Sequence, residues 1–376
     1  MSAEAEALPI IDISPFLDPK ATPGARFYCA QSLSKACLNH GFFYLKNHSV
    51  PPALTSEVLS LARAFFNECS PEEKVKIKRQ DAGNQLGDGA RGYQVIGDNV
   101  TKGKRDWHEA IDWYRPIIPG EGSFSSASTH HAEASNGLPK SRIPHNPPYT
   151  LLNGMNFWPS HPREFRKVYE EYIEHMLALG TAVVRAMGHA LGLQDPEAFV
   201  KATQESFWVM RAIGYPPLPK KNGGRLNGDL HAEENEKEEE EEGVSCGAHT
   251  DYGCLTLLLA DSTPGALQVQ SRLHPNIWIP ADPIEGAFVV NIGDMMERWT
   301  GGLWKSTLHR VVHRGDGFRV SVPFFFEPDF DARVGRLEGL GRAEEGREVV
   351  YGEYLIGKVN GNFYGNGSGE KEDGES

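Results

Sequence analysis

The sequence feature that most constrains the fold is a succession of short β-rich runs in the C-terminal half of the chain. After Phe207, segments rich in β-branched and aromatic residues alternate with Gly, Pro, Asp and Asn. Many short strands separated by turn residues are typical of a β-sandwich or a jelly-roll barrel. We expect strands at residues 207–215, 255–260, 267–270, 277–280, 287–292, 308–313 and 318–326.

The clearest helix is expected at residues 162–193. Its apolar residues recur at helical spacing and form one long stripe, which has to pack against a large surface such as a sheet. The stripe consists of Phe165, Tyr169, Tyr172, Met176, Leu179, Val183, Met187 and Leu191. Earlier in the chain we expect strands at 8–13 and 42–45 and helices at 24–39 and 53–66, the first helix stopped by Gly41. The pattern of residues 101–113 is mixed and does not indicate either a helix or a strand.

These patterns predict a mainly β protein with helices. A double-stranded β-helix (jelly-roll) core at 206–335, with a flexible acidic insertion at 228–243, would follow a mixed α/β N-terminal region at 1–150 and a scaffold helix segment at 151–205. Residues 336–376 would form a C-terminal extension with an acidic tail. Residues 120–148, which include His130 and His131, are rich in Ser, Asn, Gly and Pro and are expected to form a long exposed loop.

The charge distribution excludes two classes of partner. The formal net charge is −13, and −11 of it lies in residues 229–242 and 370–376, so the rest of the chain is nearly neutral. No basic face for nucleic acid or for a membrane surface is visible. The acidic run at 238–242 could dock a partner or bind cations, but we favour a tolerated surface-loop insertion.

The cysteines and the apolar runs indicate a cytoplasmic protein. The five cysteines show no paired spacing, which favours a reducing compartment. The N-terminus has no basic region followed by an apolar signal core, and no apolar run reaches the roughly 20 residues of a membrane span. We expect a monomer that acts on a small molecule.

Three residues in the β-rich half have the pattern of metal ligands. His249 and Asp251 are two apart, so in extended backbone they face the same side. His309 can come from a strand across the barrel. Two histidines and one carboxylate on one face, with the other coordination positions open, are typical of non-haem Fe(II) oxygenases. Zinc sites are more often closed by their ligands.

A second pair of residues predicts an anion site. Arg319 and Ser321 are again two apart and share a strand face. A guanidinium matches a carboxylate with paired donors, and a buried arginine without an anionic partner would be costly. This suits a dicarboxylate bound to the metal at one end and to Arg319 and Ser321 at the other. His313 is the rival to His309 but is only six residues from Arg319, so we interpret it as structural or pocket-lining.

At these residues the chain resembles the isopenicillin N synthase-like family of 2-oxoglutarate-dependent dioxygenases, over nearly its whole length. The matching motifs are Ile10-Ile-Asp-Ile13, Gly41-Phe-Phe-Tyr-Leu-Lys-Asn-His48, Ala64-Phe-Phe66, Pro71-Glu-Glu-Lys74, Arg91-Gly-Tyr93, His249-Thr-Asp-Tyr-Gly253, Asn291-Ile-Gly-Asp294, Ser306-Thr-Leu-His-Arg-Val311, Arg319-Val-Ser321 and Phe324-Phe-Phe-Glu-Pro328.

The resemblance implies iron ligation by the two histidines and the aspartate, and 2-oxoglutarate anchoring by Arg319 and Ser321. It also implies a co-substrate contact by Tyr215. Where many members have Asn and Tyr in the strand before that tyrosine, this chain has Ile213 and Gly214, so one polar contact is missing. The implied cofactors are Fe(II), 2-oxoglutarate and O2, with ascorbate as a stimulant, and the implied products include succinate and CO2.

The substrate is not specified by these motifs. Arg211 alternates with Tyr215 onto one strand face, and Glu327 follows Arg319 by eight residues. Each could contact substrate or serve in a structural ion pair. We expect oxidation, most simply hydroxylation, of a C–H bond of a small metabolite, in secondary metabolism. The alternatives are a desaturase, a cyclase or ring-expanding oxidase on the same fold, and a catalytically inactive metabolite-binding jelly roll.

Overall fold

Two antiparallel β-sheets form the centre of the protein. The computed structural model describes residues 7–81, 88–101, 103–116, 152, 154–218, 244–340 and 348–364. The larger sheet has eight strands, with one parallel pair at its edge, β1–β2. Its order is β1 (Ile10–Asp12), β2 (Phe42–Lys46), β12 (Phe288–Ile292), β9 (Leu255–Ala260), β14 (Arg319–Phe326), β7 (Val209–Tyr215), β6 (Glu109–Tyr114) and β3 (Gly92–Gln94).

The smaller sheet carries the strands that matter most for the site. Its order is β11 (Trp278–Pro280), β10 (Leu267–Gln270), β13 (His309–Val311) and β8 (Cys246–His249). Two short ribbons lie outside both sheets: β4 (Val100–Thr101) with β5 (Lys104–Arg105), and β15 (Arg333–Val334) with β16 (Val349–Val350).

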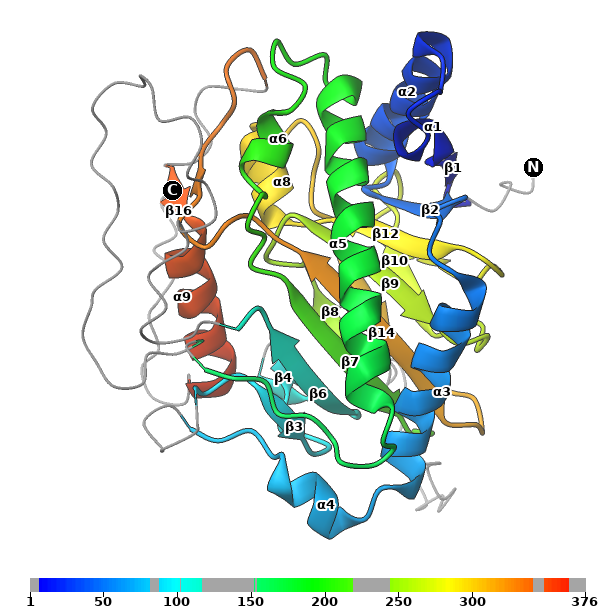
Figure 1. The fold of residues 1–376 in the computed structure, drawn as a ribbon, viewed down its shortest axis with the longest axis vertical. Coiled ribbons are helices and arrows are strands. Elements are labelled where there is room, and N and C mark those ends of the chain that lie inside the picture. The colour runs from blue at the N-terminus through cyan, green and yellow to red at the C-terminus, as the bar shows by residue number, and fades with distance from the viewer. Residues whose placement is uncertain are drawn as a thin grey trace, which may run out of the picture.

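Helices cover the outer face of the larger sheet. The longest, α5 (Phe165–Ala190), runs across this face beside α3 (Pro52–Glu68) and packs against β14 and β9 (Figure 1). The apolar stripe expected at 162–193 is buried along α5, from Phe165 to Met187. The other helices in the described ranges are α1 (Ser14–Leu17), α2 (Pro23–Asn39), α4 (Pro71–Lys76), α6 (Ala198–Lys201), α8 (Asp294–Trp299) and α9 (Tyr351–Tyr364).

Strand alternation divides the buried side chains into two cores. Met210 and Ala212 of β7 point to the helices, whereas Ile213 and Tyr215 point into the space between the sheets. The inter-sheet core also takes Val269 of β10 and other residues of both sheets. Two facing sheets with a shared core between them form the jelly roll expected from the sequence.

Most of the expected elements are confirmed to within a few residues. Strands 255–260 and 267–270 have the expected bounds, and Gly41, with φ of +67°, follows the C-cap of α2 as expected. The mixed stretch 101–113 contains β5 and most of β6. Strand β8 and helix α9 were not expected from the sequence.

Three expectations fall on residues outside the described ranges. These are the loop with His130 and His131, the acidic insertion and the acidic tail. Within the described ranges, no helix combines the length and the apolar character needed to cross a membrane.

Candidate functional site

The structure brings the three sequence-predicted ligand residues together. His249 ends β8 and His309 begins β13, and the two are direct partners in the sheet register. Asp251 follows two residues after His249. Its Oδ1 lies 3.7 Å from Nε2 of each histidine, and one donor atom from each residue lies within 4.8 Å of the others.

Backbone carbonyls orient both imidazoles. Nδ1 of His249 lies 2.7 Å from the carbonyl oxygen of Gly247, and Nδ1 of His309 lies 3.2 Å from that of Thr307. Nε2 of each ring therefore faces Asp251. Histidine ligands of metal sites are usually oriented in this way.

Asp251 is held as a carboxylate. Its Oδ2 accepts hydrogen bonds from Thr256 Oγ1 at 2.5 Å and from Asn291 Nδ2 at 2.6 Å, which leaves Oδ1 facing the histidines. Burial would raise its pKa, but His309, His249 and the two hydrogen bonds outweigh burial and lower it. Burial, together with His249, lowers the pKa of His309 to about 4. A carboxylate and imidazole nitrogens suit a divalent metal such as Fe(II).

A cavity between the two sheets contains this cluster. The larger sheet contributes residues of β7, β9, β12 and β14, and the smaller sheet contributes residues of β8, β10 and β13. The lining residues are Phe42, His108, Arg211, Ile213, Tyr215, Cys246, His249, Asp251, Thr256, Leu258, Leu267, Asn291, His309, Val311, Arg319, Ser321, Pro323 and Phe325.

Arg319 is the polar side chain of this cavity whose surroundings most require a ligand. It is 2% exposed, and its Nε and Nη1 have no hydrogen-bond partner among the described residues. Its guanidinium carbon lies 4.7 Å from the ring centroid of Tyr215, its register partner on β7. Ser321 lines the same cavity. A buried cation with unpaired donors fits an anionic ligand such as a dicarboxylate.

Arg211 faces the cavity and is also ion-paired. Its Nε donates to Asp112 Oδ1 at 2.7 Å and its Nη2 donates to Asn99 Oδ1 at 3.1 Å. Asp112 is its cross-strand partner on β6. The two roles weighed for Arg211 from the sequence are therefore compatible, because the ion pair fixes a guanidinium that lines the cavity.

Glu327 and His313 lie elsewhere. Glu327 is buried and accepts a hydrogen bond from the Cys254 backbone at 2.8 Å, and it is not among the lining residues. His313 is buried with its Nε2 2.6 Å from the Gly317 carbonyl oxygen, and it too is absent from the lining.

Sequence reasoning missed several residues of the site. Thr256 and Asn291 bind the carboxylate of Asp251, while His108 and Cys246 line the cavity. Asn291 belongs to the matching motif Asn291-Ile-Gly-Asp294, and Thr256 lies in the strand expected at 255–260. Both residues could therefore have been proposed for the site from the sequence. His108 had none, because only the register of β6 against β7 brings it to the cavity.

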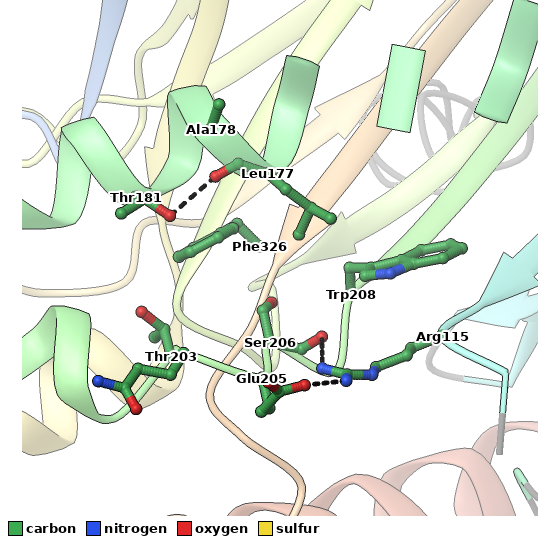
Figure 2. Close-up of a pocket in the computed structure, with 10 residues that line it drawn as sticks. Arg115, Leu177, Ala178, Thr181, Thr203, Glu205, Ser206, Trp208 and Phe326 are labelled. Atoms are coloured by element: carbon green, nitrogen blue, oxygen red, sulfur yellow. Dashed lines mark hydrogen bonds and ion pairs between the residues drawn. The ribbon is translucent and has the colours of Figure 1, made fainter. Parts of the chain in front are cut away.

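A second cavity lies on the helix side of the larger sheet, and its Arg115 and Thr181 side chains already have partners. Figure 2 shows Arg115 directed at Glu205 and Ser206, and Thr181 bonded to its own helix at Leu177. The Arg115 guanidinium forms an ion pair with Glu205, and Nη1 donates to the Ser206 carbonyl oxygen at 3.4 Å. This cavity does not contain any of the predicted ligand residues.

Family models and curated relatives place the chain in the same family of non-haem dioxygenases. Residues 8–161 match the model of the non-haem dioxygenase in morphine synthesis N-terminal region, and residues 211–328 match that of the 2OG-Fe(II) oxygenase superfamily. The chain is 39% identical to homoarginine-6-hydroxylase of Glycine max, an alignment covering 96% of this chain and 99% of the relative. It is 37% identical to a homoarginine-6-hydroxylase of Arabidopsis thaliana, covering 96% and 99%.

Solved structures share the fold over nearly the full length. A Neurospora crassa protein solved in complex with alpha-KG and 5-formyluracil superposes with a TM-score of 0.70 at 24% identity, covering 96% of this chain and 97% of that one. A putative 2OG-Fe(II) oxygenase family protein of Caulobacter crescentus superposes with a TM-score of 0.69 at 25% identity, covering 95% and 99%.

Proposed function

We propose a substrate class for this enzyme, because its reaction class is shown by its relatives. The chain belongs to the 2OG-Fe(II) oxygenase superfamily and is a 2-oxoglutarate-dependent dioxygenase that acts on a small metabolite. Its cofactor is Fe(II), and its co-substrates are 2-oxoglutarate and O2.

We assign iron binding to His249, Asp251 and His309, and 2-oxoglutarate binding to Arg319 and Ser321 with Tyr215 beside them. The bound iron supplies the oxidising chemistry. The chain's own part is to hold the carboxylate of Asp251 toward two fixed imidazoles and to neutralise the distal carboxylate of the co-substrate with Arg319. The inter-sheet cavity places all of these groups around one space.

The proposed reaction is hydroxylation of an aliphatic C–H bond in an amino acid with a carboxylate, and a guanidino amino acid is the first candidate. The observation that carries this proposal is Arg211, a second arginine lining the cavity besides Arg319. Asp112 and Asn99 hold it in one orientation, so it can receive a substrate carboxylate without reordering. The relatives named homoarginine-6-hydroxylase, which span nearly the whole chain, support the choice of a guanidino side chain.

The proposal is tested with purified protein, Fe(II), 2-oxoglutarate and ascorbate. Homoarginine, arginine, lysine and their decarboxylated amines are offered separately, and succinate and the mass of each product are measured. We expect one added oxygen atom on a guanidino amino acid and little turnover of its amine. Loss of two hydrogen atoms would instead show desaturation. Equal turnover of acid and amine would remove the role of Arg211 in carboxylate binding.

A matched pair of variants separates the role of Arg211 from a general effect of charge. Arg211→Met should raise the KM for the amino acid by about 30-fold or more, since a charge-assisted contact is worth roughly 2 kcal/mol or more. Arg333→Met removes an exposed arginine that pairs with Glu348 and should leave KM unchanged.

We also propose a cytoplasmic location, which is supported by the cysteines. Cys29, Cys37, Cys69, Cys246 and Cys254 are all free, as expected in a reducing compartment. Fractionation of the native host cells with a thiol-state assay tests this location.

A further inference from the structure

A second cluster of metal-ligand residues lies beside the proposed iron ligands. Asp106 and His108 precede β6, and Cys246 begins β8. One donor atom from each lies within 4.8 Å of the other two. This cluster shares no residue with the set formed by His249, Asp251 and His309.

His108 has the orientation of a histidine ligand. It is 2% exposed, and its Nδ1 lies 2.8 Å from the carbonyl oxygen of Ser245. Its Nε2 is buried and has no hydrogen-bond partner among the described residues. His249 and His309 are held by backbone carbonyls at Nδ1 in the same way.

Hydrogen bonds fix the carboxylate of Asp106 beside Cys246. The carboxylate of Asp106 accepts hydrogen bonds from Thr101 Oγ1 at 2.8 Å and from the Gly247 backbone at 3.0 Å. The second bond ties Asp106 to the residue next to Cys246. Outer hydrogen bonds of this kind commonly orient the carboxylate ligands of metal sites.

The two clusters lie on opposite edges of one imidazole. Nε2 of His249 faces Asp251 at 3.7 Å, whereas its Nδ1 lies 3.8 Å from Sγ of Cys246. The nearby cation Arg211 would oppose a second metal ion, and its ion pair with Asp112 at 2.7 Å weakens this repulsion. The local charge therefore allows a dication beside Cys246.

We propose that Asp106, His108 and Cys246 form a second metal site, which takes Zn²⁺ or a similar dication of intermediate softness. Thiolate, imidazole and carboxylate are the ligands that zinc takes in proteins, and three of them leave one position of a tetrahedron open. Binding transfers the thiol proton of Cys246 to solvent as the Zn–S bond forms. Because His108 and Cys246 line the substrate cavity, an ion there excludes substrate and inhibits turnover.

Co²⁺ is a suitable probe, because a cobalt–thiolate bond gives a sulfur-to-metal charge-transfer absorption that the proposed iron ligands cannot give. Metal-free full-length protein is titrated with Co²⁺ under anaerobic conditions. We expect this absorption in the wild type and in His309→Ala, which lacks a proposed iron ligand. Cys246→Ser should abolish it, and Cys69→Ser, a buried cysteine at the end of α3, should leave it unchanged.

Variants of His108 and Asp106 distinguish a three-ligand metal site from chance binding of the metal at the Cys246 thiol alone. His108→Ala should weaken Co²⁺ binding at the thiolate by about 100-fold or more, and Asp106→Asn should also weaken it. Circular dichroism establishes that each variant is folded. After dialysis against Zn²⁺, the wild type should hold two ions per chain, and Cys246→Ser and His309→Ala one each. No charge-transfer absorption in the wild type, or an unchanged affinity in folded His108→Ala, would overturn the proposal.

Discussion

Replacing Arg319 should stabilise the ligand-free protein and remove most of the stabilisation that 2-oxoglutarate adds. Arg319 is buried, and two of its nitrogens have no partner among the described residues. Each unsatisfied buried donor costs roughly 1–3 kcal/mol. Arg319→Met keeps much of the side-chain volume and removes this cost, so the melting temperature of the ligand-free protein should rise.

The same substitution should remove most of the stabilisation by 2-oxoglutarate. Loss of a buried charge-assisted partner costs roughly 2–5 kcal/mol, and about 2.7 kcal/mol corresponds to 100-fold weaker binding. At a concentration 100 times the wild-type Kd, 2-oxoglutarate stabilises the wild type by about 2.7 kcal/mol. At that concentration the variant would gain only about 0.4 kcal/mol.

The assay is thermal unfolding under anaerobic conditions with Fe(II), with and without 2-oxoglutarate. Ser321→Ala is the control at the same site, because it removes one neutral donor and should lose only about 1 kcal/mol of the ligand effect. Iron content should match the wild type in both variants. A full 2-oxoglutarate-dependent shift in Arg319→Met would refute the assignment of the co-substrate anchor.

Three further predictions test the surroundings of the proposed iron ligands. His309→Ala should abolish turnover and iron retention, whereas His313→Ala should keep both, because the His313 ring is bonded to the Gly317 carbonyl and does not line the cavity. Equal loss in two folded variants would reverse the ligand assignment. Gly253→Ala would place a Cβ 1.5 Å from Glu327 Oε2, so we expect about 1–3 kcal/mol of destabilisation and weaker iron binding, measured by denaturant unfolding and iron titration. Burial raises the pKa of Glu327 from 4.5 to about 8. The stability that its bound proton contributes is fully present below pH 4.5 and is lost progressively as the pH rises to about 8. Glu327→Gln should therefore gain melting temperature relative to wild type between about pH 5 and pH 8, and parallel curves of melting temperature against pH would contradict this.

The parts of the fold with strong sequence periodicity were predictable. The apolar stripe of α5 repeats at helical spacing, β9 is a mainly apolar run, and β10 alternates apolar and polar residues. Their positions therefore follow from local pattern. Strand β8 was missed because Cys-Gly-Ala-His has little β propensity and is held in place by β13. Helix α9 was missed because Gly352, Gly357 and Gly361 interrupt its sequence.

The site divides in the same way. His249 and Asp251 lie two residues apart, so a local pattern predicted that they meet, and His309 and Arg319 completed a recognisable order. The contact of Arg211 with Asp112, and the position of His108 in the cavity, depend on the register of β6 against β7. No local pattern encodes that register, because the two strands are almost 100 residues apart in the chain.

Because His249 and His309 are direct register partners, metal binding at both depends on the correct alignment of β13 with β8. The side chains of neighbouring residues on a strand point to opposite faces, so a slip of one residue between β13 and β8 would turn His309 away from the cavity and bring Arg310 toward it. A misaligned chain would then lack a proposed ligand and gain a repelling cation. Iron would bind only the correctly aligned sheet and so stabilise it selectively by mass action. Under the proposed ligand set, the cofactor that performs the oxidation also favours the correct strand alignment during folding.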